Sequence, residues 1–263
     1  MGNFDQIILS CNEDKTYSTF WKPVAQAYKK MFPDVKIKLA LLTYRDEDDE
    51  VIKEYRKYGD EVKLYKPVSW LPQFGQAKMI RFLLASEQGE DVCYIDDIDL
   101  FPLSKTFITD KTDKRPKDHL LCVGGEVYGN NGCYPLSQIT TEGYNYKKIF
   151  NPNDLDYENL MEWYYKTPVM FDLRENIGVI NDFAKDIYFS DERLIRRLRQ
   201  SAGVPVFEQP RGYDNFMVAT LDRYDWKIDL QKLKAHKYLN AHCSRPFDIR
   251  DCEPLIDYIN QNY

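Results

Sequence analysis

The stretch that decides the fold reads Tyr-Ile-Asp-Asp-Ile-Asp-Leu-Phe-Pro-Leu and occupies residues 94–103. It begins as an apolar run typical of a buried strand and passes into three carboxylates. Side chains alternate along a strand, so we expect Asp97 and Asp99 to point to one side and Asp96 to the other. Two adjacent carboxylates repel each other unless a cation neutralises them, and oxygen ligands suit Mg²⁺ or Mn²⁺. The pattern favours a divalent-metal site over the alternative, a solvated turn after the strand.

The composition is that of a globular protein. The chain has 263 residues, of which 43% are hydrophobic and 30% charged, which suits one large domain or a compact pair. A net charge of -6 argues against a general nucleic-acid surface. No apolar run is long enough for a transmembrane segment, and the N-terminus lacks a signal-peptide pattern. Because the six cysteines form no Cys-x-x-Cys pair, we expect reduced thiols and a cytoplasmic protein.

Strand-like and helix-like segments alternate along the first half of the chain. We expect strands at residues 6–11, 35–42, 62–65 and 92–95, with helices at 17–31, 46–58 and 75–86. This alternation predicts a mainly parallel sheet with right-handed crossovers. Ligands of such sheets bind beyond the carboxyl ends of the strands. The loop after Cys11 and the Asp97/Asp99 pair both lie at such ends, so we expect them to share one crevice.

The second half is less regular. A further strand is expected at residues 120–127, and Ser190 has the character of a helix N-cap. Asp191 and Glu192 would then lie in the first helical turn. No segment has the composition of a linker between independent domains.

Two cationic segments complement the aspartates. Lys78 and Arg81 lie three residues apart on the helix before the aspartate-bearing strand, so they share a face, although an exposed helix face would look the same. Near the C-terminus, residues 240–247 read Asn-Ala-His-Cys-Ser-Arg-Pro-Phe. His242 offers an imidazole ligand and Arg245 a fork for phosphate. The alternative for His242 is a structural histidine.

Together these segments resemble nucleotide-sugar-dependent glycosyltransferases of the GT-A type. The triplet Asp97-Ile98-Asp99 looks like their DxD motif, and His242 matches the late histidine that completes the metal site in many members. The resemblance covers roughly the first 105 residues and the last 30. It implies an α/β, GT-A-like fold: a mainly parallel central sheet with a Rossmann-like N-terminal nucleotide-binding half and a mixed acceptor-side half. Residues 1–263 would form a single domain, with a nucleotide-sugar-binding subregion at 1–105 and an acceptor-binding subregion at 106–263.

The resemblance also implies an activity and a set of site residues. The protein would be a metal-dependent transferase that moves a sugar from a UDP- or GDP-sugar to a hydroxyl of a glycan, lipid or protein, with Mn²⁺ (or Mg²⁺) as cofactor. The implied metal ligands are Asp97, Asp99 and His242. The implied nucleotide-sugar-binding residues are Ser10, Cys11, Asn12, Tyr17, Lys78, Arg81, Asp97 and Arg245.

The catalytic carboxylate has rival candidates. An inverting transferase needs a base for the acceptor hydroxyl, whereas a retaining one needs none from the protein. Asp191 and Glu192 fall where the family often places an acidic motif, yet a helix dipole alone favours acids there. Asp214, in Arg-Gly-Tyr-Asp-Asn, is the rival, although Asn215 departs from the Asp-Gln pair of some retaining members. We prefer Asp191 and leave the stereochemistry open.

Two other functions fit part of the pattern. A nucleotidyltransferase acting on a sugar phosphate usually has a glycine-rich basic loop after the first strand, but residues 10–14 contain two acids and no glycine. A non-catalytic nucleotide- or carbohydrate-binding protein with the same fold has no physical reason to keep both aspartates together with His242. Both alternatives are therefore less favoured than the transferase.

Overall fold

A computed structural model describes residues 3–124, 135–166, 198–210 and 219–263. Its main sheet has the strand order β3-β2-β1-β4-β7-β6-β8. The strands are β1 (Gln6–Asn12), β2 (Lys36–Leu42), β3 (Glu61–Tyr65), β4 (Val92–Ile95), β6 (Leu120–Val123), β7 (Ile139–Glu142) and β8 (Val206–Gln209). The first four are mutually parallel, and β7 runs antiparallel to β4 and to β6. The predicted α/β class with a mainly parallel sheet is confirmed.

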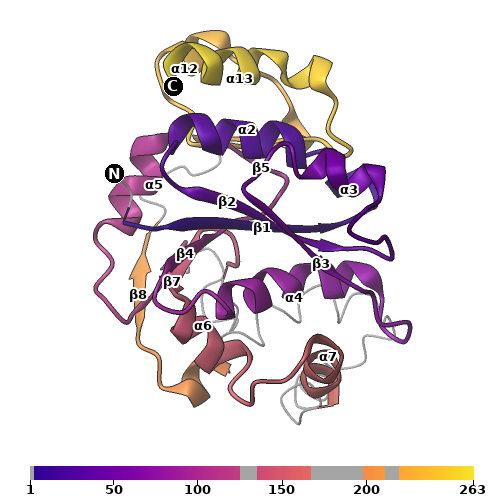
Figure 1. Ribbon diagram of the computed structural model, residues 1–263. Coiled ribbons are helices and arrows are strands. Elements are labelled where there is room, and N and C mark those ends of the chain that lie inside the picture. The colour runs from indigo at the N-terminus through magenta and orange to yellow at the C-terminus, as the bar shows by residue number, and fades with distance from the viewer. Residues whose placement is uncertain (1–2, 125–134, 167–197, 211–218) are drawn as a thin grey trace, which may run out of the picture.

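Helices cover both faces of this sheet (Figure 1). The described helices are α1 (Lys15–Ser18), α2 (Trp21–Met31), α3 (Glu50–Tyr55), α4 (Gln73–Ser86), α5 (Lys105–Thr112), α6 (Gly143–Phe150), α7 (Tyr157–Lys166), α12 (Leu230–Lys234) and α13 (Ile249–Asn262). In Figure 1, α4 and α6 lie below the sheet and α2 above it, and the C-terminal α13 packs on α2. Two buried apolar clusters fill the space on the two faces.

Most of the predicted elements of the first half are present. The four expected strands are found within one residue of their predicted ends. The helix expected at residues 17–31 is instead two helices, and Pro23 lies in the first turn of the second, where its missing N–H costs no hydrogen bond. The helix expected at 46–58 is shorter, because Asp49 accepts a hydrogen bond from the Val51 amide at 2.8 Å and so caps its start. Of the strand expected at 120–127, residues 125–127 lie outside the described chain.

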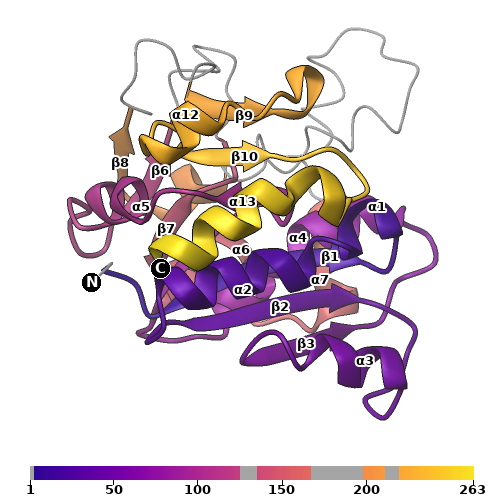
Figure 2. The ribbon, with the colours of Figure 1, turned by 90° about the horizontal axis from the view of Figure 1, so that it is seen from above.

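A second, three-stranded sheet joins a strand that follows β4 to two strands from the C-terminal part of the chain. It consists of β5 (Leu100–Pro102), β10 (Asn240–His242) and β9 (Thr220–Asp222), in that order. Figure 2 shows β9 and β10 side by side next to α13. Phe101, Ala241 and Leu221 are register partners, and all three are buried in the core. Because side chains alternate, the neighbouring set Leu100, His242 and Asp222 faces the other way.

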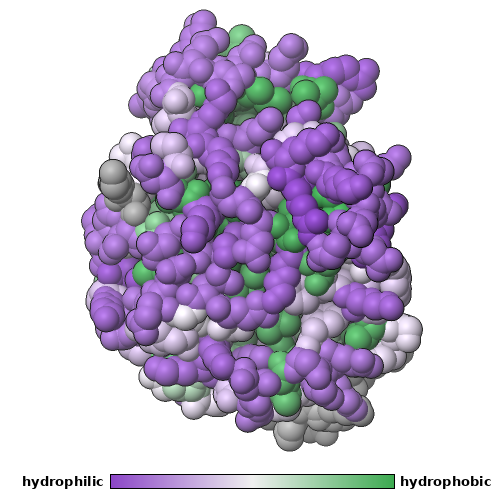
Figure 3. All heavy atoms as spheres, in the orientation of Figure 1, coloured by the Kyte–Doolittle hydropathy of each residue, from purple (hydrophilic) through white to green (hydrophobic). Residues whose placement is uncertain are grey.

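Three further features concern the helices, the cysteines and the surface. Within the described chain no helix is both long and apolar enough to cross a membrane. The five described cysteines are buried and free. Figure 3 shows a mainly hydrophilic face with hydrophobic side chains gathered between α13 and α2, where Phe247, Ile256 and Ile259 line a groove.

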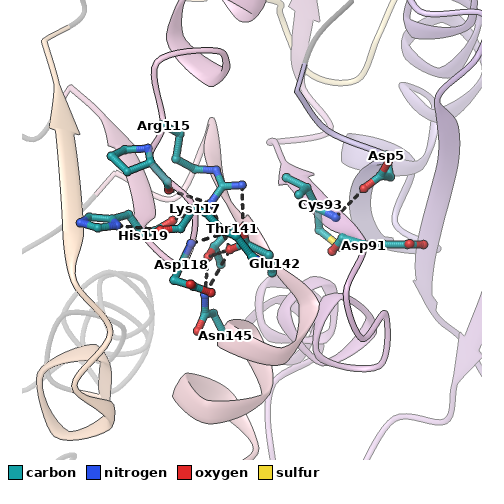
Figure 4. Close-up of polar contacts among 12 residues, drawn as sticks. Asp5, Asp91, Cys93, Arg115, Lys117, Asp118, His119, Thr141, Glu142 and Asn145 are labelled. Carbon is teal, nitrogen blue, oxygen red and sulfur yellow. Dashed lines mark hydrogen bonds and ion pairs between the residues drawn. The ribbon is translucent and has the colours of Figure 1, made fainter.

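A buried ion pair stabilises the end of the main sheet that lies opposite the aspartates. Arg115 and Glu142 have side chains only 2% and 4% exposed and pair in a bidentate manner, with N···O distances of 2.9 and 3.0 Å. Asn145 adds a hydrogen bond to the same carboxylate at 3.2 Å, as Figure 4 shows. Burial raises the pKa of Glu142, but hydrogen bonding and charge from Arg115 outweigh burial and lower it overall. Glu142 ends β7 and precedes α6, so the pair ties the connector after α5 to this corner of the core.

Removing one member of this pair leaves the other charge buried and unpaired. We expect Glu142→Ala to lower the free energy of unfolding by about 3–5 kcal/mol, measured by urea denaturation. Lys147→Ala is the matched control, because Lys147 on α6 pairs with Asp154 at the surface and should cost no more than about 1 kcal/mol. Equal effects of the two variants would contradict the structural role given to the buried pair.

Candidate functional site

Asp99 is a buried carboxylate surrounded by cationic groups. It follows β4, directly precedes β5 and is 5% exposed. Its Oδ2 atom lies 3.0 Å from Nη1 of Arg223, 2.8 Å from Nε of Arg245 and 3.3 Å from Nε2 of His242. A buried charge is tolerated only when it is paired in this way. Asp99 is therefore the point at which these three side chains converge.

The contact between Asp99 and His242 shifts the pKa of both side chains. Burial raises the pKa of Asp99, but the hydrogen bond and charge of His242 and the charge of Arg245 lower it overall. Burial lowers the pKa of His242, and the hydrogen bond and charge of Asp99, with the charges of Asp97 and Asp222, raise it overall. Both directions indicate an ionised Asp99 carboxylate.

The small sheet places these groups together. His242 is the register partner of Leu100, the neighbour of Asp99, on one side and of Asp222 on the other. The Cys243 amide donates a hydrogen bond to the Asp99 carbonyl at 3.3 Å. Asp222 also caps the short 3-10 helix η2 (Arg223–Asp225), because its carboxylate accepts from the Tyr224 amide at 2.9 Å. The strand register and this cap together direct Arg223 towards Asp99.

Asp97 has a different partner. Arg81 of α4, which is 4% exposed, donates to the Asp97 carboxylate at 2.6 Å and to the Asp96 carbonyl at 3.0 Å. Strand β4 ends at Ile95, and the Leu100 amide bonds the Asp97 carbonyl at 3.1 Å. The aspartates thus occupy a turn, and the strand alternation used to place Asp97 and Asp99 on one side does not apply to them. The expected neutralisation is present, but arginines provide it.

Asp96 is directed into the core. Its carboxylate accepts hydrogen bonds from the Tyr28 hydroxyl of α2 at 2.6 Å and from the Asp97 amide at 2.9 Å. Burial raises its pKa to about 7, although the Tyr28 hydrogen bond opposes the shift. These contacts give Asp96 a structural role in the core.

The predicted nucleotide-binding residues from the two chain ends also meet. Arg245 donates a hydrogen bond to the Tyr17 hydroxyl, and its guanidinium carbon lies 5.0 Å from the centre of the Tyr17 ring. Ser10 and Asn12, at the carboxyl end of β1, are partly exposed. Cys11 between them is 2% exposed and its side chain packs in the core, where burial raises its pKa.

Four further predicted residues remain. Lys78 is half-buried on α4, one turn before Arg81. The three candidate catalytic acids, Asp191, Glu192 and Asp214, lie outside the described residues. Their roles stay predictions.

Arg223 and Asp222 are the site residues that the sequence reading missed. Nothing in their local spacing distinguishes them, since Asp-Arg-Tyr is an ordinary polar turn. The only available signal was indirect: a buried aspartate needs cations, and Arg223 is one of many arginines that could supply one.

The donor chemistry of the Asp99 cluster fits a divalent metal. A carboxylate oxygen and an imidazole nitrogen, 3.3 Å apart, are ligand types that Mn²⁺ accepts. Asp222 lies 3.9 Å from the other ring nitrogen of His242, which is too far for a hydrogen bond. Among the described residues, however, no three carboxylate, imidazole or thiol groups already converge as a complete metal cage. The described chain thus provides two ligands of an incomplete metal site, Asp99 and His242, and the Arg223 side chain contacts both.

Comparison with known proteins supports the fold class. No protein-family model matches the chain, and no curated protein matches it in sequence. Among solved structures, the glycosyltransferase GlyE of Streptococcus pneumoniae TIGR4 is similar over 99% of this chain and 63% of its own, with 12% identity and a TM-score of 0.52. Its apo form gives 11% identity and a TM-score of 0.50 over the same shares. The galactosyltransferase LgtC, in complex with donor and acceptor sugar analogs, has 12% identity and a TM-score of 0.49 over 97% of this chain and 94% of its own.

The fold is therefore of the GT-A glycosyltransferase type. At this level of identity the likeness concerns the fold alone, and the chain spans about 63% of the length of GlyE.

The raised pKa of Asp96 makes a prediction about stability and pH. A carboxyl with a pKa of about 7 in the folded protein and about 4 when unfolded holds its proton more tightly in the folded state. Its contribution to stability is complete below pH about 4 and is lost as the pH rises through about 7. Asp96→Asn removes this loss, so the free energy of unfolding of the variant should rise relative to wild type by a few kcal/mol between pH 4 and 8.

The measurement is urea denaturation at several pH values in EDTA. Asp154→Asn, at an exposed carboxylate, controls for the general effect of removing one negative charge. A difference between Asp96→Asn and wild type that stays constant across this range would refute the assignment.

Proposed function

We propose that the protein is a metal-dependent glycosyltransferase that transfers a sugar from a nucleoside-diphosphate donor to an acceptor hydroxyl. The observation that carries the proposal is the meeting of His242 and Arg245 on the Asp99 carboxylate, just beyond the carboxyl end of β4, which runs parallel to β1. Ligands of open α/β sheets bind at this edge. The GT-A fold supports the proposal because it is the fold of GlyE.

The nucleoside would occupy the crevice after β1. Ser10 and Asn12 offer polar side chains there, and Tyr17 offers a ring for stacking on the base or ribose. The Arg245 guanidinium, held against the Tyr17 ring, is then placed for the first phosphate. In this arrangement Tyr17 and Arg245 position the donor together.

The diphosphate leaving group needs positive charge as the sugar departs. Asp97, Asp99 and His242 would hold Mn²⁺ or Mg²⁺, which when bound supplies Lewis-acid stabilisation of that charge. Arg81 donates a hydrogen bond to the Asp97 carboxylate and holds it in place. Arg245 adds a fixed guanidinium on the phosphate side, and such preorganised charge is worth most in a buried site.

The remaining parts of the proposal concern the acceptor. Asp191, which lies beside Glu192 and has Asp214 as its rival, is proposed as the carboxylate base that receives the acceptor proton if the enzyme is inverting. We propose a UDP- or GDP-sugar as donor, a glycan, lipid or protein as acceptor, residues 106–263 as the acceptor side of a single domain, and action in the cytoplasm.

The test is a panel of mass-tagged nucleotide sugars scored for metal-dependent hydrolysis and transfer. We expect at least one UDP- or GDP-sugar to be consumed with Mn²⁺ and spared in EDTA. In isothermal titration, UDP or GDP should bind more tightly with Mn²⁺ than with EDTA. Equal binding in both conditions would contradict the metal–diphosphate site.

Asp99→Asn should remove turnover on the active donor by at least about 100-fold, the size of losing one preorganised electrostatic group. Asp225→Asn is the matched control, because Asp225 is an exposed carboxylate in the neighbouring η2 and should retain activity. Circular dichroism checks that both variants fold. Wild-type turnover in Asp99→Asn would show that Asp99 is not part of the site.

A further inference from the structure

Arg223 lies where a cation between Asp99 and His242 would lie. Its Nη1 is 3.0 Å from the Asp99 carboxylate, and its Nη2 is 3.0 Å from Nδ1 of His242 and also contacts Nε2 of that ring. The same guanidinium thus contacts two of the three groups that the proposed function assigns to a metal, Asp99 and His242. A divalent ion on these two groups would meet the positive charge of Arg223 at contact distance.

The two carboxylates of the cluster already have cationic partners. Asp97 pairs with Arg81, and Asp99 pairs with Arg223 and Arg245. A strong metal site normally presents carboxylates that lack other cations, because their mutual repulsion favours the ion. Here the arginines relieve that repulsion, which weakens the driving force for metal binding.

Arg223 also keeps hydrogen-bonding capacity for another anion. Its Nε is buried and has no hydrogen-bond partner in the described chain, and its side chain is 14% exposed. Guanidinium groups bind phosphate oxygens through paired N–H groups. If Arg223 left Asp99, a diphosphate next to Arg245 would be a suitable new partner.

We infer that Arg223 is an internal cation that occupies the metal position until the nucleoside diphosphate arrives. The inference rests on the proposed function and deepens it. Binding of the diphosphate attracts the Arg223 guanidinium away from Asp99 and His242, and the divalent ion takes its place. Because coupling between two ligands is reciprocal, diphosphate and metal then strengthen each other's binding partly through Arg223.

The test measures Mn²⁺ binding alone, by the electron paramagnetic resonance signal of the free ion. Without nucleotide, Arg223→Gln should bind Mn²⁺ at least about fivefold more tightly than wild type, since a coupling of this kind is commonly 5- to 150-fold. Arg223→Lys keeps the positive charge and should stay close to wild type. Lys227→Gln, which removes one positive charge from an exposed side chain four residues further along the chain, is the matched control and should not change the affinity.

The second arm repeats the titration with saturating UDP or GDP. The nucleotide should tighten Mn²⁺ binding in wild type by a larger factor than in Arg223→Gln. Asp99→Asn should weaken Mn²⁺ binding in both arms. Thermal unfolding followed by circular dichroism confirms that each variant is folded.

The outcomes separate the two hypotheses. The role given to Arg223 is overturned if Arg223→Gln binds Mn²⁺ no more tightly than wild type. It is also overturned if Arg223→Gln and Arg223→Lys tighten Mn²⁺ binding equally. The proposed function survives that result as long as UDP or GDP still binds wild type better with Mn²⁺ than with EDTA. If the nucleotides bind equally well in EDTA while Arg223→Gln tightens Mn²⁺ binding, the proposed function fails and Arg223 still occupies a metal position.

Discussion

The arrangement of the site depends on the burial of one charge, the Asp99 carboxylate. A carboxylate that is 5% exposed is stable only with close cationic partners. Arg223, His242 and Arg245 meet that need, and they come from the C-terminal part of the chain, 124 residues away for Arg223. The turn after β4 therefore brings charged side chains from the last strands of the chain against the first half of the fold.

The three-stranded sheet holds the backbone in the position that brings these side chains to Asp99. One set of its register partners, Phe101, Ala241 and Leu221, fills the core, and the alternate set carries His242 and Asp222 towards Asp99. Apolar burial thus fixes the backbone, and the side chains one residue away inherit their positions. The backbone that carries this cluster is therefore held in place by the core. Arg223 differs from the rest, since it begins the short η2 after β9, and a residue at the end of an element can change its rotamer without disturbing the sheet.

The sequence predicts the four parallel strands of the first half well because buried strands and amphipathic helices have distinct apolar periods. It did not predict β7 and β8, which lie in the less regular second half. Asp99, His242 and Arg245 do lie together as expected, although their roles remain predictions. The placement of Asp97 and Asp99 on one strand face was wrong, because the chain leaves the strand at Ile95 and turns. Arg223 escaped prediction because three-residue strands carry too little periodicity to reveal which distant side chains they bring together.

The central claim is that Asp99 and His242 form a cation site for a nucleoside diphosphate, with Arg223 as its occupant in the absence of ligand. The most direct measurement is anomalous diffraction from crystals soaked in Mn²⁺ with UDP or GDP, compared with crystals in EDTA. The account predicts a Mn²⁺ peak bonded to Asp99 and His242 in the soaked crystals, with the Arg223 guanidinium on the diphosphate. A Mn²⁺ peak elsewhere, or Arg223 still paired with Asp99 beside a bound nucleotide, would contradict it.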